Sequence, residues 1–291
     1  MLKLWFILAV LTALAAALKD VFSKIAVTTA NPYLVAWAWS AGALPFLLPL
    51  LLVIDLPPLG PRFWPALFAG GLLHIGATIL YIKALKASDL SLTIPMITLT
   101  PLFLLVTSPL MLGELPSAAS MTGIILIVVG SYLLNIHEYH KGFLEPFRAL
   151  VREPGPRLML GVALIWSVTA NIDKIGITGS SPLAWVIAVD SFVAVAPIVW
   201  LLSPAAERRL STMRIRKLAP IGLSAALVLI LQMHAIQLTL VPYVIAIKRT
   251  SVLFSILFGL LVFGEKRIRE RLLGAAIMVV GVVIIAMFSC S

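Results

Sequence analysis

The sequence contains little charge and almost no cysteine. Of its 291 residues only 12% are charged and 61% are hydrophobic, whereas a soluble domain has about 25% charged and about 45–50% apolar residues. This shortage of charge excludes a single water-soluble globule. The only cysteine, Cys290, excludes a disulfide framework and a cysteine-rich metal site.

Sequence signatures of enzymes are also missing. There is no glycine-rich phosphate-binding loop, no nucleophile motif and no pair of histidines at metal-binding spacing. We therefore expect no enzymatic activity, no metal and no cofactor. The longest polar connection, 137–157, carries arginine and glutamate and has no apolar core of its own. The protein must then act in or beside a membrane.

Long apolar runs are what the sequence does contain. A helix that crosses a bilayer needs about 20 mostly apolar residues, because the hydrocarbon offers its backbone no hydrogen-bond partner. Ten such runs occur, so we predict an all-α integral membrane fold with ten transmembrane helices. They cover residues 2–26, 32–54, 63–85, 90–112, 116–136, 158–178, 182–202, 218–238, 242–263 and 272–288.

The positions of the basic residues predict the orientation. Lysine and arginine near the ends of spans prefer the cytoplasmic side. Of the 22 basic residues, 17 lie in the odd-numbered connections, with Lys19 and Lys24 assigned to the first. We therefore expect both termini on the outer face. The net charge of +10 is then mainly a topology signal that also favours contact with anionic lipid, and it does not indicate nucleic-acid binding.

The chain repeats itself. Residues 71–130 align without a gap on 222–281, so that Gly113-Glu114 falls on Gly264-Glu265, and Lys24 falls on Lys174 near the start of each copy. We expect a first five-helix repeat at 1–138, a cytoplasmic linker at 139–156 and a second five-helix repeat at 157–291. An odd number of spans inverts the second copy, a plan common in secondary transporters, whose binding site lies near the midplane.

These features resemble a known family. Two five-helix units, each with a lysine at the end of its first helix and a Gly-Glu then Gly pattern across its fourth and fifth helices, are similar to the EamA-type members of the drug/metabolite transporter superfamily. The resemblance implies a ten-helix transporter. It does not name a substrate, because members carry amino acids, sugars, nucleotide sugars, cations and drugs.

The adjacent cations Lys248 and Arg249 are the first candidates for substrate binding. They lie about seven residues into the ninth expected span, where an ionisable group costs a few kcal/mol unless it has a partner. Their repeat counterparts are uncharged, so the pair is not part of the shared scaffold. The pair resembles the Lys-Arg pair that holds phosphate in plastid sugar-phosphate translocators. A further lysine of those proteins is replaced here by Ile97, which favours a carboxylate or a monoanionic phosphodiester.

Further polar residues inside the expected spans are candidates for the lining of the same site. They are Thr98, Tyr81, Gln232, His74 and His234. His74 and His234 have an alternative role that is equally compatible with the sequence, a hydrogen bond to the backbone of a neighbouring helix. Glu114 and Glu265 are expected to accept hydrogen bonds from the next helix's free backbone donors. Lys24 and Lys174 are expected to anchor helix ends at the membrane interface.

Asp190, in the seventh expected span, has two alternative roles. It could neutralise one of the two cations, or it could carry a proton that drives transport. The leading hypothesis is a secondary transporter in a prokaryotic plasma membrane that moves a small organic anion or zwitterion. The alternatives are an exporter of amino acids or amphipathic drugs whose Lys-Arg pair is neutralised by Asp190, and a membrane protein that binds lipid headgroups without transport. The sequence is also compatible with a homodimer.

Overall fold

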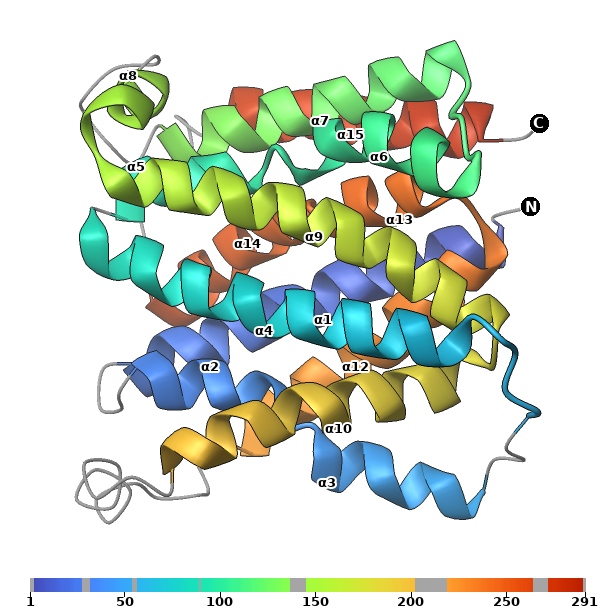
Figure 1. Cartoon of the computed structure of the whole chain (residues 1–291). Coiled ribbons are helices and arrows are strands. Elements are labelled where there is room, and N and C mark those ends of the chain that lie inside the picture. The colour runs from blue at the N-terminus through green and yellow to red at the C-terminus, as the bar shows by residue number, and fades with distance from the viewer. Residues whose placement is uncertain are drawn as a thin grey trace.

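The chain folds as a bundle of helices (Figure 1). The computed structural model describes residues 3–27, 32–53, 57–88, 90–136, 145–201, 219–263 and 272–289, which contain helices and no strand. The helices are α1 (Leu4–Val27), α2 (Pro32–Ser40), α3 (Leu44–Leu47), the 3₁₀ helix η1 (Leu48–Leu52), α4 (Phe63–Ala87), α5 (Leu90–Ile97), α6 (Thr100–Leu112), α7 (Ala118–Ile136), α8 (Glu145–Arg152), α9 (Pro154–Thr178), α10 (Pro182–Leu201), α12 (Ala219–Leu238), α13 (Val241–Lys248), α14 (Ser251–Phe263) and α15 (Leu272–Phe288).

The expectation of a helical membrane protein is confirmed. Six helical segments are long and apolar enough to cross a bilayer, and four shorter apolar helices accompany them in the described part of the chain. Large apolar side chains also face outward along the bundle, among them Leu72, Val106 and Leu110. Such a surface is stable against lipid and would be costly in water.

The second expected span, 32–54, is not one continuous helix. It is divided into α2, α3 and η1, with a turn at residues 41–43. Pro45 and Pro49 lack the backbone donor that a continuous helix would use. A side chain on Gly42 would collide with the carbonyl oxygen of Ala38, so the turn depends on glycine. The short helix α8, in the connection before α9, was not predicted.

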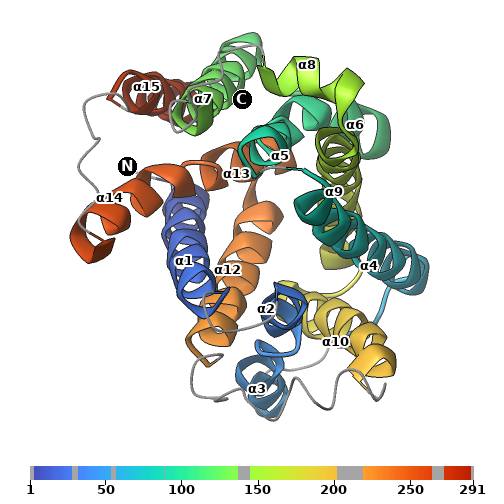
Figure 2. The ribbon, with the colours of Figure 1, turned by 90° about the vertical axis from the view of Figure 1, so that its left-hand side faces the viewer.

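The two halves of the chain interlock. Helix α1 packs mainly on α12, and the corresponding helices α9 and α4 pack on each other. Helix α1 and its counterpart α9 run in opposite directions across the bundle, as do α7 and α15 (Figure 1). Figure 2 shows α1, α12, α13, α5, α9, α4 and α2 arranged around the middle of the bundle. The amino- and carboxyl-terminal ends lie together, because Lys3 Nζ donates to the carbonyl oxygen of Ser289 over 3.3 Å.

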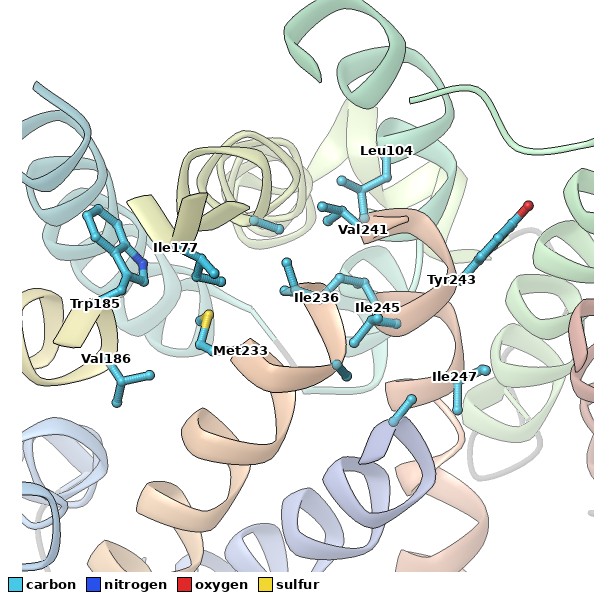
Figure 3. Close-up of a cluster of buried hydrophobic side chains, with 14 of the residues drawn as sticks. Leu104, Ile177, Trp185, Val186, Met233, Ile236, Val241, Tyr243, Ile245 and Ile247 are labelled. Carbon is cyan, nitrogen blue, oxygen red and sulfur yellow. The ribbon is translucent and has the colours of Figure 1, made fainter. Parts of the chain in front are cut away.

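The core is built on α13 and the ends of α9 and α12. Seven consecutive residues of α13, Val241–Ile247, are buried. Figure 3 shows Val241 beside Leu104 of α6, and Ile245 beside Ile236 of α12. Trp185 of α10, which is fully buried, closes the far side of this cluster. Helix α13 is therefore packed into the core up to Ile247, the residue before Lys248.

Candidate functional site

Two helices break in the interior of the bundle at corresponding positions of the two repeats. Helix α5 ends at Ile97 and α6 begins at Thr100, while α13 ends at Lys248 and α14 begins at Ser251. Hydroxyl groups at both breaks donate to carbonyl oxygens three residues earlier, Thr98 to Pro95 and Thr250 to Ile247, each over 2.7 Å. Side-chain bonds of this kind compete with the helical backbone pattern. Broken helices at the repeat interface are where secondary transporters place their ligands.

Lys248 and Arg249 stand at the break between α13 and α14 and reach different helices. Lys248 Nζ donates to Gln232 Oε1 of α12 over 2.5 Å. Arg249 Nη2 donates to Thr100 Oγ1, at the start of α6, over 2.8 Å. The buried Nε of Arg249 has no hydrogen-bond partner among the described residues. Two cations thus lie inside the bundle with neutral contacts, and one donor is left for a ligand.

A second pair of charges approaches this site from α1. Asp20 interacts electrostatically with Lys19, Lys248 and Arg249, although it makes no hydrogen bond or close ion pair with any described residue. Its side chain is exposed to solvent, although it stands near the cations at the end of α13. Asp20 is therefore an accessible acid near the site.

Lys19 is held in place by an aromatic ring. Its Nζ lies 4.0 Å from the centre of the Trp39 ring on α2, a cation–π contact. The indole is itself fixed, because Trp39 Nε1 donates to Ser23 Oγ over 3.1 Å. Lys19 also interacts electrostatically with Arg249 and Lys248. Its assignment to a connection was therefore wrong: it lies within α1 and is directed at the candidate site.

Tyr81 belongs to a row of three aromatic side chains beside the charges. Its ring centre lies 5.9 Å from that of Trp39 and 6.0 Å from that of Trp166, and it stacks on Trp166 at 24°. Tyr81 also interacts electrostatically with Arg249. The row joins α2, α4 and α9, and Tyr81 brings it near Arg249. Tyr81 was predicted as lining, whereas Trp166 was not.

Two of the predicted lining residues turn towards their own helices. Thr98 is buried and bonded to Pro95, so Thr100 is the threonine that contacts Arg249. His234 Nδ1 lies 2.8 Å from the carbonyl oxygen of Ile230, one turn earlier on α12. His234 is therefore bonded to a helix backbone, which was the alternative to a role in substrate binding, but the backbone is that of its own helix and not of a neighbour. Gln232, by contrast, is brought directly to Lys248.

His74 lies beside a different carboxylate. Its Nε2 is 3.8 Å from Asp173 Oδ1 on α9. Asp173 also accepts a hydrogen bond from Trp185 Nε1 over 2.9 Å, so it does not pair locally with the neighbouring Lys174. Asp173 makes the weakest of the electrostatic interactions with Lys248. His74 and Asp173 thus adjoin the candidate site without contacting its cations.

Asp190 is not the counter-charge of Lys248 or Arg249. Within the described part of the chain its carboxylate accepts a hydrogen bond from the Ser40 side chain, and its Oδ2 has no partner. The acidic residue near the two cations is Asp20. Sequence reasoning missed it because Lys19-Asp20 was read as the start of a connection. The sequence did contain a signal that Asp20 lies inside the first span. The charged pair Lys19-Asp20 is followed by several more apolar residues of the run 2–26.

Glu114 and Lys174 join the two repeats at the end of the bundle that holds the termini. Lys174 Nζ lies 3.2 Å from Glu114 Oε1 and also donates to the carbonyl oxygens of Ile236 and Thr239. Glu114 Oε2 accepts the backbone N–H of Val241 over 2.8 Å. Glu114 therefore caps α13 of the other repeat and not the following helix. Lys174 is thus an ion-pair partner of Glu114 near the end of α9, and its expected role as an interfacial anchor stays a prediction. Glu265 lies outside the described residues.

An apolar bundle with paired broken helices and interior charges defines a membrane protein built like a transporter. The model of the EamA-like transporter family matches residues 3–136 and 154–287, one match for each repeat. The chain therefore belongs to the EamA-like transporter family. No curated protein matches it in sequence. A crystal structure, titled only "Crystal structure of protein", covers 98% of this chain and 98% of its own at 17% identity, with a TM-score of 0.69. That likeness supports the fold alone.

Proposed function

We propose that the protein is a ten-span secondary transporter that moves a small organic anion or zwitterion across a prokaryotic plasma membrane by alternating access. The observation that carries this proposal is the break between α13 and α14, where Lys248 and Arg249 stand in the interior with only neutral hydrogen-bond partners. Charges inside a membrane protein are costly and mark ligand or ion pathways. An anionic group bound there supplies the missing counter-charge.

Each cation has a separate task in binding. Arg249 offers a planar fork suited to a carboxylate or phosphodiester, and its unpartnered Nε is one of the donors available for it. Lys248 adds a point charge on a flexible stem, positioned by Gln232. Thr100 accepts a hydrogen bond from Arg249, and Tyr81 interacts with its guanidinium electrostatically. The two cations thus bind the anionic group of the substrate, and the rings of Trp39, Tyr81 and Trp166 contact the remainder of it.

Alternating access rests on the inverted repeats. Contacts at the end of the bundle that holds the termini, centred on Glu114 and Lys174, close that end. In the sequence repeat, Lys174 corresponds to Lys24, in the last turn of α1, and Glu114 corresponds to Glu265, which lies outside the described residues. We propose that the two ends open in turn, with the termini on the outer face.

Uptake into proteoliposomes tests this function. Purified protein is reconstituted and challenged with radiolabelled organic anions, zwitterions, cations and neutral solutes. We expect saturable uptake of anions or zwitterions, abolished by Lys248→Gln and by Arg249→Gln. The matched control is Lys83→Gln, which removes an exposed lysine near the end of α4. Unchanged uptake in the first two variants would contradict the site, and the lack of saturable uptake of any water-soluble solute would favour lipid-headgroup binding.

A further inference from the structure

The charges on α1 extend the candidate site. We propose that Lys19 is a third anion-binding residue and that Asp20 is the resident counter-ion which the substrate's anionic group replaces, so that the site selects an anion over a zwitterion. This inference rests on the proposed function, because it assumes that Lys248 and Arg249 bind the substrate. It adds residues from the other repeat and narrows the class of substrate.

The repeat comparison separates these charges from the scaffold. Lys24 of α1 has a lysine, Lys174, at its counterpart position, so it belongs to the shared framework. At the same offset of 150, Lys19 corresponds to Thr169 and Asp20 to Ala170, which are both uncharged. Lys248 and Arg249 likewise have uncharged counterparts. Each of the four charges therefore occurs in only one of the two copies, Lys19 and Asp20 in the first and Lys248 and Arg249 in the second, so none belongs to the scaffold that the repeats share.

The geometry places Lys19 where an anion can meet it. The Trp39 ring, 4.0 Å away, holds the ammonium inside the bundle without neutralising it. Asp20, the adjacent carboxylate, is exposed and, among the described residues, makes no hydrogen bond or close ion pair with any of the cations. A carboxylate that attracts three cations without contacting them can be replaced by a ligand that reaches them.

The balance of charge decides the class of substrate. Lys19, Lys248 and Arg249 all interact electrostatically with one carboxylate, Asp20. Asp173 acts on Lys248 only weakly and already accepts the Trp185 N–H. The excess is positive, and in a site enclosed by protein such an excess attracts anions strongly. A substrate's ammonium group would meet three cations, and among the described residues the acid that acts on all three is Asp20.

The arrangement also gives the anion a mechanical role. Lys19 belongs to α1 of the first repeat, whereas Lys248 and Arg249 belong to the second. An anion held between them makes contacts with both repeats at once. Its binding energy is then available to hold the two repeats in one arrangement, which is how a ligand shifts a conformational equilibrium.

Three solutes of similar chain length test the inference. Glutarate carries two negative charges, glutamate carries a net charge of one, and 4-aminobutyrate is a zwitterion. Their affinities are measured by competition for anion uptake in proteoliposomes and by the rise in melting temperature of the purified protein. We expect affinity to fall in the order glutarate, glutamate, 4-aminobutyrate. Tightest binding of 4-aminobutyrate, with its loss in Asp20→Asn, would overturn the inference.

Variants of α1 should change anion affinity in opposite directions. Lys19→Gln should weaken glutarate binding about tenfold, and Asp20→Asn should strengthen it severalfold because a competing carboxylate is removed. Lys19→Arg should retain binding, which separates loss of charge from misfolding. Lys3→Gln, at the start of the same helix, should have no effect. A purely structural role would weaken binding in both variants, and that result would overturn the inference.

The outcomes distinguish the inference from the proposed function. Anion uptake that depends on Lys248 and Arg249 but is unchanged in Lys19→Gln would reject the inference and keep the function. Lack of saturable uptake of every solute tested would reject both.

Discussion

Lys174 and Glu114 form an ion pair of 3.2 Å between the two repeats, and both side chains are largely buried, with 16% and 12% of their surface exposed. Each also satisfies a helix end, because Lys174 bonds two terminal carbonyl oxygens near the end of α12 and Glu114 caps α13. One pair of side chains thus ties together α9, the turn after α6 and the connection from α12 to α13.

Removal of Glu114 should destabilise the protein. Glu114→Ala leaves the Lys174 ammonium buried without its acid and the Val241 N–H without its acceptor, a loss of about 3 kcal/mol. Glu114→Gln should cost less because its amide oxygen can still accept the Val241 N–H. Thermal unfolding in detergent measures both. Glu153→Gln, which removes a carboxylate just before α9, is the control, and an Ala variant as stable as the control would contradict the proposed lock.

Glycines at equivalent positions of the two repeats meet in the structure. Gly123 of α7 packs on Gly281 of α15, and Gly130 packs on Gly274, so the four repeated glycines lie at one crossing of the two helices. A Cβ on Gly281 would stand 2.6 Å from the carbonyl oxygen of Gly123. Small residues of this kind let membrane helices approach closely.

Alanine at this crossing should therefore disturb the fold. Gly281→Ala forces α7 and α15 apart, and overpacking of this kind costs about 1–3 kcal/mol. Gly161→Ala is the matched control, because nothing lies within 4 Å of the Cβ it would add. Melting temperatures in one detergent compare the two variants. Equal stability would show that α7 and α15 do not need their close contact.

Sequence reasoning located the apolar helices and the interior cations but not the contacts around them. The length of each apolar run and the exclusion of charge from lipid are local properties, so they can be read along the chain. Lys248 and Arg249 stood out for that reason. Their partners Gln232 and Thr100 come from other helices, and only packing determines which side chains meet.

The break after α13 shows a second limit. Prolines at 95 and 101 mark a bend in the fourth span, whereas the ninth span has alanine and valine at the corresponding positions. The structure nevertheless interrupts both, since a hydroxyl bond from Thr250 to Ile247 stands at the break of the ninth. A threonine bonds in this way only in some surroundings, so its presence alone does not predict a break.

Gln232 should control a balance between stability and transport. Its Oε1 accepts the Lys248 ammonium, and the side chain is buried. Gln232→Glu places a carboxylate against Lys248 with almost no change in shape. We expect a higher melting temperature together with anion affinity at least tenfold weaker, because the new carboxylate competes with the substrate. Gln232→Leu removes the acceptor without adding charge, so it should lower the melting temperature. Parallel changes in stability and affinity in Gln232→Glu would contradict this account.

Asp190 carries a separate prediction about energy coupling. The structure removes its expected role as a counter-charge, since its described contact is with Ser40 and its Oδ2 is unpartnered. We propose that Asp190 carries a proton, because a buried carboxylate inside a membrane span is a candidate proton site. Asp190→Asn should abolish uptake driven by a pH gradient while substrate exchange at equal pH continues. Both rates are measured in the same proteoliposomes. Ser40→Ala removes the hydrogen bond without the carboxylate and should keep pH-driven uptake, whereas unchanged pH-driven uptake in Asp190→Asn would exclude Asp190 as the coupling residue.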